Sequence, residues 1–79
     1  MRTLTDQERW VLAVGGVVER IVDLTRAERE AEIIDRLPNA VLVRTTHRAA
    51  SELGRTPNAI IRVFDTEAAG RRALGLFDA

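Results

Sequence analysis

Cysteine is absent from the 79-residue sequence, and its absence excludes both a disulfide framework and a metal site built on thiolates. Histidine is nearly absent too, because His47 is the only one and has no second histidine at ligand spacing. The sequence also lacks a glycine-rich phosphate loop and a nucleophile motif. We therefore expect a protein that is not an enzyme and that holds neither a cofactor nor a metal.

Long hydrophobic runs are also missing. The longest run extends from Trp10 to Val18, which is less than half of the roughly 20 apolar residues that a membrane-spanning helix needs. Asp6 and Glu8 stand where an export signal would carry positive charge. These features predict a cytoplasmic protein that does not associate with a membrane.

Lysine is missing as well, since all twelve basic residues are arginine, and they balance twelve acidic residues. A coding bias toward arginine explains this better than nucleic-acid recognition does. The distribution is more informative: residues 1–39 carry six arginines against eight acids, and residues 40–79 carry six against four. Between Arg44 and Arg62 four arginines accompany a single acid, Glu52. This basic stretch is typical of a surface that faces an anion.

The pattern of apolar residues favours an all-α fold. A capping box at Thr5–Glu8 opens a predicted helix that extends to about residue 24. A hairpin of residues 10–14 and 17–22 around Gly15-Gly16 is the alternative, but adjacent charges at 19 and 20 suit the helix better. The apolar stripe of this helix is wide for so short a chain, which suggests a homodimer. The residues expected at the dimer interface are Trp10, Val14, Gly15, Val18 and Ile21.

Further start and stop signals predict three or four more helices in one small domain, residues 1–79. A second capping box at Thr25–Glu28 opens a helix that ends near Pro38, and a third helix covers residues 40–53 with Gly54 as its stop. Thr56-Pro57 opens the next helix, and a short fifth helix could follow residue 65. Residues 1–38 then form packing and dimerisation helices, and residues 39–79 form the second half of the domain.

An α+β fold is the alternative. Two segments near residues 40–45 and 59–64 are rich in β-branched residues, and each precedes a helix-like stretch that contains alanine. Only about a dozen residues would connect these strands, which is the minimum for a parallel crossover. A sheet of two strands would also be unstable alone, so the all-α fold is preferred.

The spacing of Ala50, Gly54 and Ile60 resembles that of the helix-turn-helix family, in which a small residue, a turn glycine and an apolar anchor recur at these intervals. The segment "LGRTPNAI" is similar to segments of sigma-factor region four and of Myb-like domains. The resemblance covers about residues 46–65. It implies that residues 39–79 are a helix-turn-helix half whose second helix, starting at Thr56, enters the major groove of duplex DNA.

The resemblance also implies a set of DNA-binding residues. Asn58 and Arg62 would bond bases, because their bidentate donor patterns match the edges of adenine and guanine, and the preceding helix would hold phosphates. The full set is Arg55, Thr56, Asn58 and Arg62 on the reading helix, with Arg44, His47 and Arg48 before it. The sequence thus predicts a small, dimeric, bacterial or phage transcription regulator. The alternative is a non-enzymatic protein-interaction module that docks on a larger partner.

Overall fold

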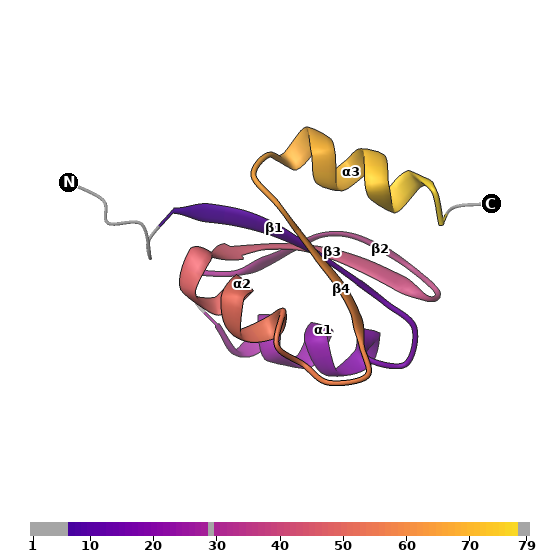
Figure 1. Ribbon diagram of the computed structural model, residues 1–79, viewed down its shortest axis with the longest axis horizontal. Coiled ribbons are helices and arrows are strands. Elements are labelled where there is room, and N and C mark those ends of the chain that lie inside the picture. Colours follow the sequence, from indigo (N-terminus) through magenta and orange to yellow (C-terminus); the bar gives the residue numbers. More distant parts are fainter. Residues whose placement is uncertain (1–6, 29, 78–79) are drawn as a thin grey trace.

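The computed structural model describes residues 7–28 and 30–77, and it shows an α+β domain. The prediction of an all-α fold is therefore wrong. The chain forms four strands and three helices (Figure 1). They are β1 (Glu8–Val14), α1 (Val18–Ala27), β2 (Glu32–Leu37), β3 (Ala40–Thr46), α2 (His47–Leu53), β4 (Ile60–Phe64) and α3 (Glu67–Gly75).

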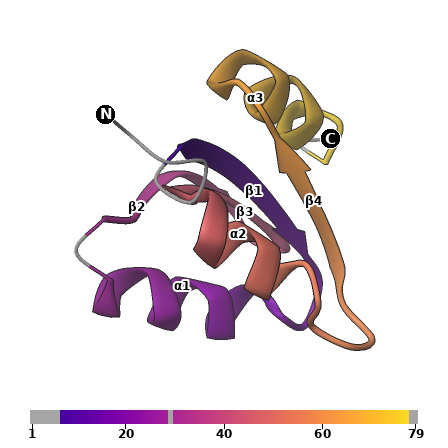
Figure 2. The ribbon, with the colours of Figure 1, turned by 60° about the vertical axis from the view of Figure 1, so that its left-hand side comes forward.

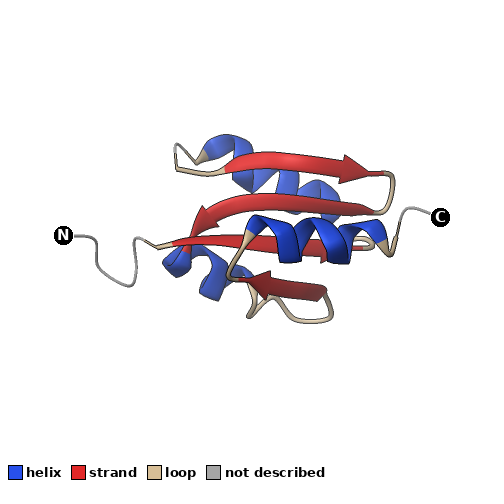
Figure 3. Ribbon diagram, turned by 90° about the horizontal axis from the view of Figure 1, so that it is seen from above, coloured by secondary structure: helices blue, strands red, loops and turns tan. Residues whose placement is uncertain are grey.

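The strands form one sheet in the order β2-β3-β1-β4, in which every neighbouring pair is antiparallel. Two β-α-β units are thus interleaved, which is the split βαβ arrangement of ferredoxin-like folds. Helices α1 and α2 lie on one face of the sheet, and α3 lies on the other (Figure 2). The sheet thus has helices on both faces, and its two edge strands are β2 and β4 (Figure 3).

The first predicted helix is wrong because its N-terminal half is a central strand. Residues 11–13 are all buried, since β1 has helices over both of its faces, and such a strand has a continuous apolar run instead of an alternating one. Periodicity cannot distinguish this run from a buried helix. The hairpin alternative is also wrong, because β1 pairs with β3 and β4, and residues 18–27 form α1.

The second predicted helix is wrong over most of its length. Thr25 does not open a helix but lies in the last turns of α1, where its hydroxyl donates a hydrogen bond to the carbonyl of Ile21. Residues 32–37 form β2, and Pro38 lies in the turn of the hairpin that joins β2 to β3. The third predicted helix is replaced by β3 and the short helix α2, for which Thr46 provides the N-cap.

The two strands of the α+β alternative are present as β3 and β4. The objection that the connection between them is too short for a parallel crossover fails because they are not neighbours in the sheet. Strand β1 lies between them and is antiparallel to both. Four strands also remove the objection that a sheet of two strands would be unstable.

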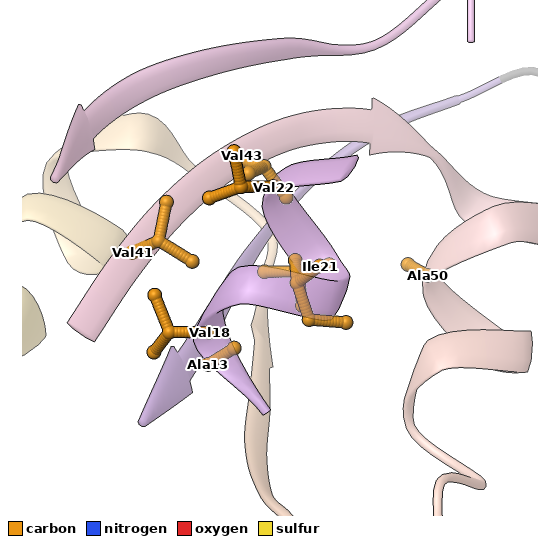
Figure 4. Close-up of a cluster of buried hydrophobic side chains, with 8 residues drawn as sticks. Ala13, Val18, Ile21, Val22, Val41, Val43 and Ala50 are labelled. Atoms are coloured by element: carbon orange, nitrogen blue, oxygen red, sulfur yellow. The ribbon is translucent and has the colours of Figure 1, made fainter. Parts of the chain in front are cut away.

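The core consists of two hydrophobic clusters on opposite faces of the sheet. The first lies under α1 and α2 (Figure 4), and its buried residues are Val11, Ala13, Val18, Ile21, Val22, Val41, Val43 and Ala50. The second lies under α3 and contains Leu12, Ala40, Leu42 and Leu74, with Trp10 and Phe64 packed against it. Alternate residues of β1 and β3 therefore supply both clusters.

Gly15 ends β1 in a conformation that favours glycine, since its φ is +89°. Its N–H donates to the carbonyl of Asn39, which extends the β1–β3 pairing by one residue. We expect Gly15→Ala to lower the free energy of unfolding by about 1–2 kcal/mol, because a Cβ is strained at this φ. The matched control is Gly16→Ala, since Gly16 does not have a positive φ and a Cβ there would meet no neighbour. Urea denaturation of both variants measures the difference, and equal losses would contradict this explanation.

Candidate functional site

The residues predicted to read DNA do not lie on a helix. The segment of residues 54–59 forms a turn, and residues 60–64 form β4, so the second helix of the expected helix-turn-helix is absent. Arg55 and Asn58 are exposed in the turn, and Thr56 is half-buried there. Asn58 has a φ of 58°, a left-handed conformation that asparagine tolerates better than most residues. This backbone position accounts for Asn58 without a base contact.

The residues predicted to hold phosphates are also dispersed. Arg44 on β3 forms ion pairs with Glu32 and Glu8, at N–O distances of 3.2 and 3.4 Å, which neutralise its charge. His47 and Arg48 lie in the first turn of α2, where Arg48 is exposed. Arg62, which was predicted to bond a base, lies on β4, separated from β3 by β1. The structure thus brings no cluster of these cations together on one described surface.

The residues predicted for a dimer interface do not share one surface. Val18 and Ile21 are 3% and 1% exposed, because they pack in the first cluster under the helices. Trp10 and Val14 pack against the second cluster on the opposite face, and Gly15 lies in the turn after β1. Within a single chain, the apolar stripe that suggested a dimer is used to build the core.

The β2 edge of the sheet is closed to a further strand. A register shift between Ile33 and Asp35 distorts the strand, and bulges and charges are the usual devices that prevent edge pairing. Asp35 also accepts a hydrogen bond from the N–H of Arg36 with its own Oδ1, at 2.8 Å. The Arg36 guanidinium forms an ion pair with Glu19 on α1. Charges, a bulge and an occupied N–H all oppose pairing at this edge.

The β4 edge is different. The direction of hydrogen bonding alternates from residue to residue along each strand, and this alternation, which we call the hydrogen-bond phase, shows which backbone groups of β4 face outward. The N–H groups of Gly15 and His47 donate to Asn39 and Gln7, respectively, so the odd-numbered residues of β1 bond to β3. The even-numbered residues of β1 must then face β4, because bonding direction alternates along an antiparallel strand. Their opposite residues on β4 are also even-numbered. The N–H and C=O groups of Ile61 and Val63 therefore point away from the sheet.

The side chains of β4 leave apolar surface at this edge. Ile60 is 59% exposed and Val63 is 44% exposed, and alternation along the strand places them on opposite faces of the sheet. Arg62 is the one charged residue of the strand and is exposed. Among the residues that the structure describes, no segment pairs with the outer side of β4. We call this outer side, residues 60–64, the open edge.

A groove between α1 and α2 is the second candidate. Its volume is about 220 Å³, below the roughly 300–1,000 Å³ of typical small-molecule sites. Leu24, 45% exposed, and Leu53 contribute apolar surface, while Arg20, Glu28 and Glu52 place charges around it. Within residues 7–28 and 30–77 no group of three or more acidic or histidine side chains is placed to hold a metal. The groove therefore offers a shallow surface, and the open edge offers a defined bonding pattern.

Comparisons with known proteins do not add to this geometry: no family model matches the sequence, and searches of curated proteins and of solved structures find no match. None of the helices in the described part of the chain has the length and apolarity required to cross a membrane.

The sequence contained part of the signal for the open edge. The β-branched composition of residues 59–64 indicated a strand, and the alternative fold included it. The order of the strands was not readable, because β4 becomes an edge only through pairing with β1, 46 or more residues away in the sequence.

Proposed function

We propose that this protein is a protein-interaction module that adds an extended segment of a partner to its sheet as a fifth strand, along the open edge. The observation that carries the proposal is the contrast between the two edges. The β2 edge has a bulge, charges and an occupied N–H, whereas the open edge presents the outward backbone groups of Ile61 and Val63. Strand addition to an exposed sheet edge is a common mode of peptide recognition.

The open edge can supply both affinity and orientation. Ile61 and Val63 each offer one donor and one acceptor, so an antiparallel partner strand can form four main-chain hydrogen bonds. The exposed parts of Ile60 and Val63 would be covered by side chains of the partner on the two faces of the sheet. Because β4 has only five residues, we expect transient binding, with a dissociation constant roughly in the micromolar to millimolar range.

Major-groove recognition of DNA is not the function that this geometry favours. The segment that the helix-turn-helix interpretation assigned to the reading helix is a turn followed by β4. The seven residues predicted to contact DNA lie on β3, α2, the turn and β4, and Arg44 is already paired with two carboxylates. Strand addition uses the outward backbone groups and the exposed apolar side chains of β4, and it requires no rearrangement of the fold.

A peptide-binding measurement tests the proposal. The probe is a labelled nine-residue peptide with blocked ends, alternating Thr and Val, and a central Glu, and its binding is followed by fluorescence anisotropy. We expect Val63→Pro to weaken binding at least tenfold, because proline removes the outward N–H without removing a bond to β1. Val63→Thr keeps the N–H and the branched shape, so it should stay within about threefold of the wild type. Equal binding by Val63→Pro and Val63→Thr, or no binding by the wild type, would refute strand addition.

A further inference from the structure

We infer that Arg62 selects the partner of the open edge: it accepts a strand that carries Asp or Glu at the position opposite it, and it disfavours a second copy of this chain. This inference rests on the proposed function, because it names the chemistry of the strand that the open edge binds. It is carried by three observations, namely the hydrogen-bond phase of β4, the lack of an ion-pair partner for Arg62 within residues 7–28 and 30–77, and the symmetry of the strand.

The hydrogen-bond phase places Arg62 at the position where an added antiparallel strand is closest. Ile61 and Val63 carry the outward backbone groups, so Arg62 lies between two hydrogen-bonded pairs and forms a non-hydrogen-bonded pair with the residue opposite it. Such pairs have a Cα–Cα distance of about 4.5 Å, against about 5.5 Å in hydrogen-bonded pairs, and their side chains are closer. On the added strand, the residue opposite Arg62 is therefore the one whose charge interacts most strongly with the guanidinium.

Arg62 has no ion-pair partner among the residues that the structure describes. Four other arginines do have one: Arg9, Arg36, Arg44 and Arg71. The nearest acid along the chain, Asp65, lies 3.5 Å from the Nε of Arg9 on β1. Across the sheet Arg62 is opposite Leu12, which is buried. A carboxylate on an added strand would give the guanidinium a charged partner that the described part of the chain does not supply, and an arginine and a carboxylate can form paired N–H···O bonds.

The symmetry of β4 makes a second copy a poor partner. In the antiparallel register that pairs all five residues of two copies, Ile61 bonds with Val63 of the other copy and the two Arg62 side chains lie directly opposite each other. Like charges opposite each other destabilise a strand pair. Residues with outward backbone groups in one copy must pair with such residues in the other copy. The nearest alternative registers are therefore shifted by two residues, which reduces the paired segment from five residues to three. Arg62 thus acts against self-association while the rest of the strand favours pairing.

The test compares three peptides that differ only at the central residue, which is Glu, Gln or Lys. For the wild type we expect the Glu peptide to bind about fivefold more tightly than the Lys peptide. This ratio corresponds to the free energy of an exposed ion pair with Arg62, together with the loss of the repulsion between Arg62 and Lys. Arg62→Glu should reverse this order, and Arg62→Gln should abolish it. Arg26→Glu, an exposed charge reversal on α1, is the control and should leave the order unchanged.

The outcomes separate this inference from the proposed function. Equal binding of all three peptides, still abolished by Val63→Pro, would overturn the role of Arg62 and leave strand addition intact. Failure of every peptide to bind the folded wild type would overturn both. Sedimentation of the wild type at the concentrations of the assay should show a monomer. A dimer that Val63→Pro dissociates would overturn the claim that Arg62 disfavours a second copy.

Discussion

Replacing Leu42 with alanine is expected to lower the free energy of unfolding by about 2–5 kcal/mol, the usual cost of removing a buried leucine and leaving a cavity. Leu42 is fully buried at the centre of β3, in the cluster under α3. It also lies against the point of closest approach of α3, because a Cβ on Gly70 would come within 2.9 Å of the Leu42 Cδ1. The substitution therefore removes one of the main contacts between α3 and the sheet.

Urea denaturation measures this loss, and the matched control is Leu76→Ala. Leu76 is 80% exposed just after α3, so its truncation should change the free energy of unfolding by no more than about 0.5 kcal/mol. A loss below about 1 kcal/mol for Leu42→Ala would mean that α3 does not cover this face of the sheet. The fold would then present a third exposed surface besides its two edges.

A pair of proline substitutions on neighbouring residues of β4 should have very different effects. Arg62→Pro removes an N–H that faces β1, and it leaves the opposite acceptor on Leu12, which is buried, without its donor. We expect a loss of roughly 2–4 kcal/mol in the free energy of unfolding. Val63→Pro removes an N–H that faces outward, which proline tolerates in edge strands. The loss in the free energy of unfolding for Val63→Pro should stay near or below about 1 kcal/mol.

Thermal denaturation of the two variants, with Arg62→Ala and Val63→Ala as controls for the lost side chains, measures this contrast. Both side chains are substantially exposed, so the alanine variants should differ little from each other. A larger loss for Val63→Pro than for Arg62→Pro would reverse the hydrogen-bond phase of β4. In that case Ile60, Arg62 and Phe64 would carry the outward groups, and the proposed site would be built on the wrong residues.

The parts of the fold that the sequence predicts are those with a clear local signal. Residues 18–24, the C-terminal part of the first predicted helix, are helical as expected, and the β-branched segments near 40–45 and 59–64 are strands, as in the alternative fold. Thr66 caps α3, where the sequence suggested a fifth short helix. In each case neighbouring residues alone determine the element, through periodicity, capping or β-propensity.

The errors came from residues whose structure depends on distant partners. The run of residues 10–14 is apolar because two sheet neighbours and helices on both faces surround it, and this environment erases the alternation that marks a strand. The turn at Thr56-Pro57 has the form of a helix start, but the pairing of β4 with β1 overrides this local preference. The second helix of the expected helix-turn-helix depended on that start, and it does not form for the same reason.

The candidate site shows the same division. Arg62 was readable as a functional residue, since it stands in a basic stretch, but its assigned role followed from a helix that does not form. Its position between two outward-facing residues became visible only with the register of β1 against β3 and β4. The open edge is thus a property of strand order, which no local pattern encodes.

The most direct test of the open edge is amide hydrogen exchange, residue by residue, on the wild-type protein. The amides of Ile61 and Val63 should exchange quickly, whereas those of Arg62 and Phe64 should be protected by their bonds to β1. Saturation with the peptide that carries a central Glu should slow the exchange of Ile61 and Val63 selectively. Slow exchange of Ile61 and Val63 in the peptide-free protein, or no change on adding the peptide, would contradict the account.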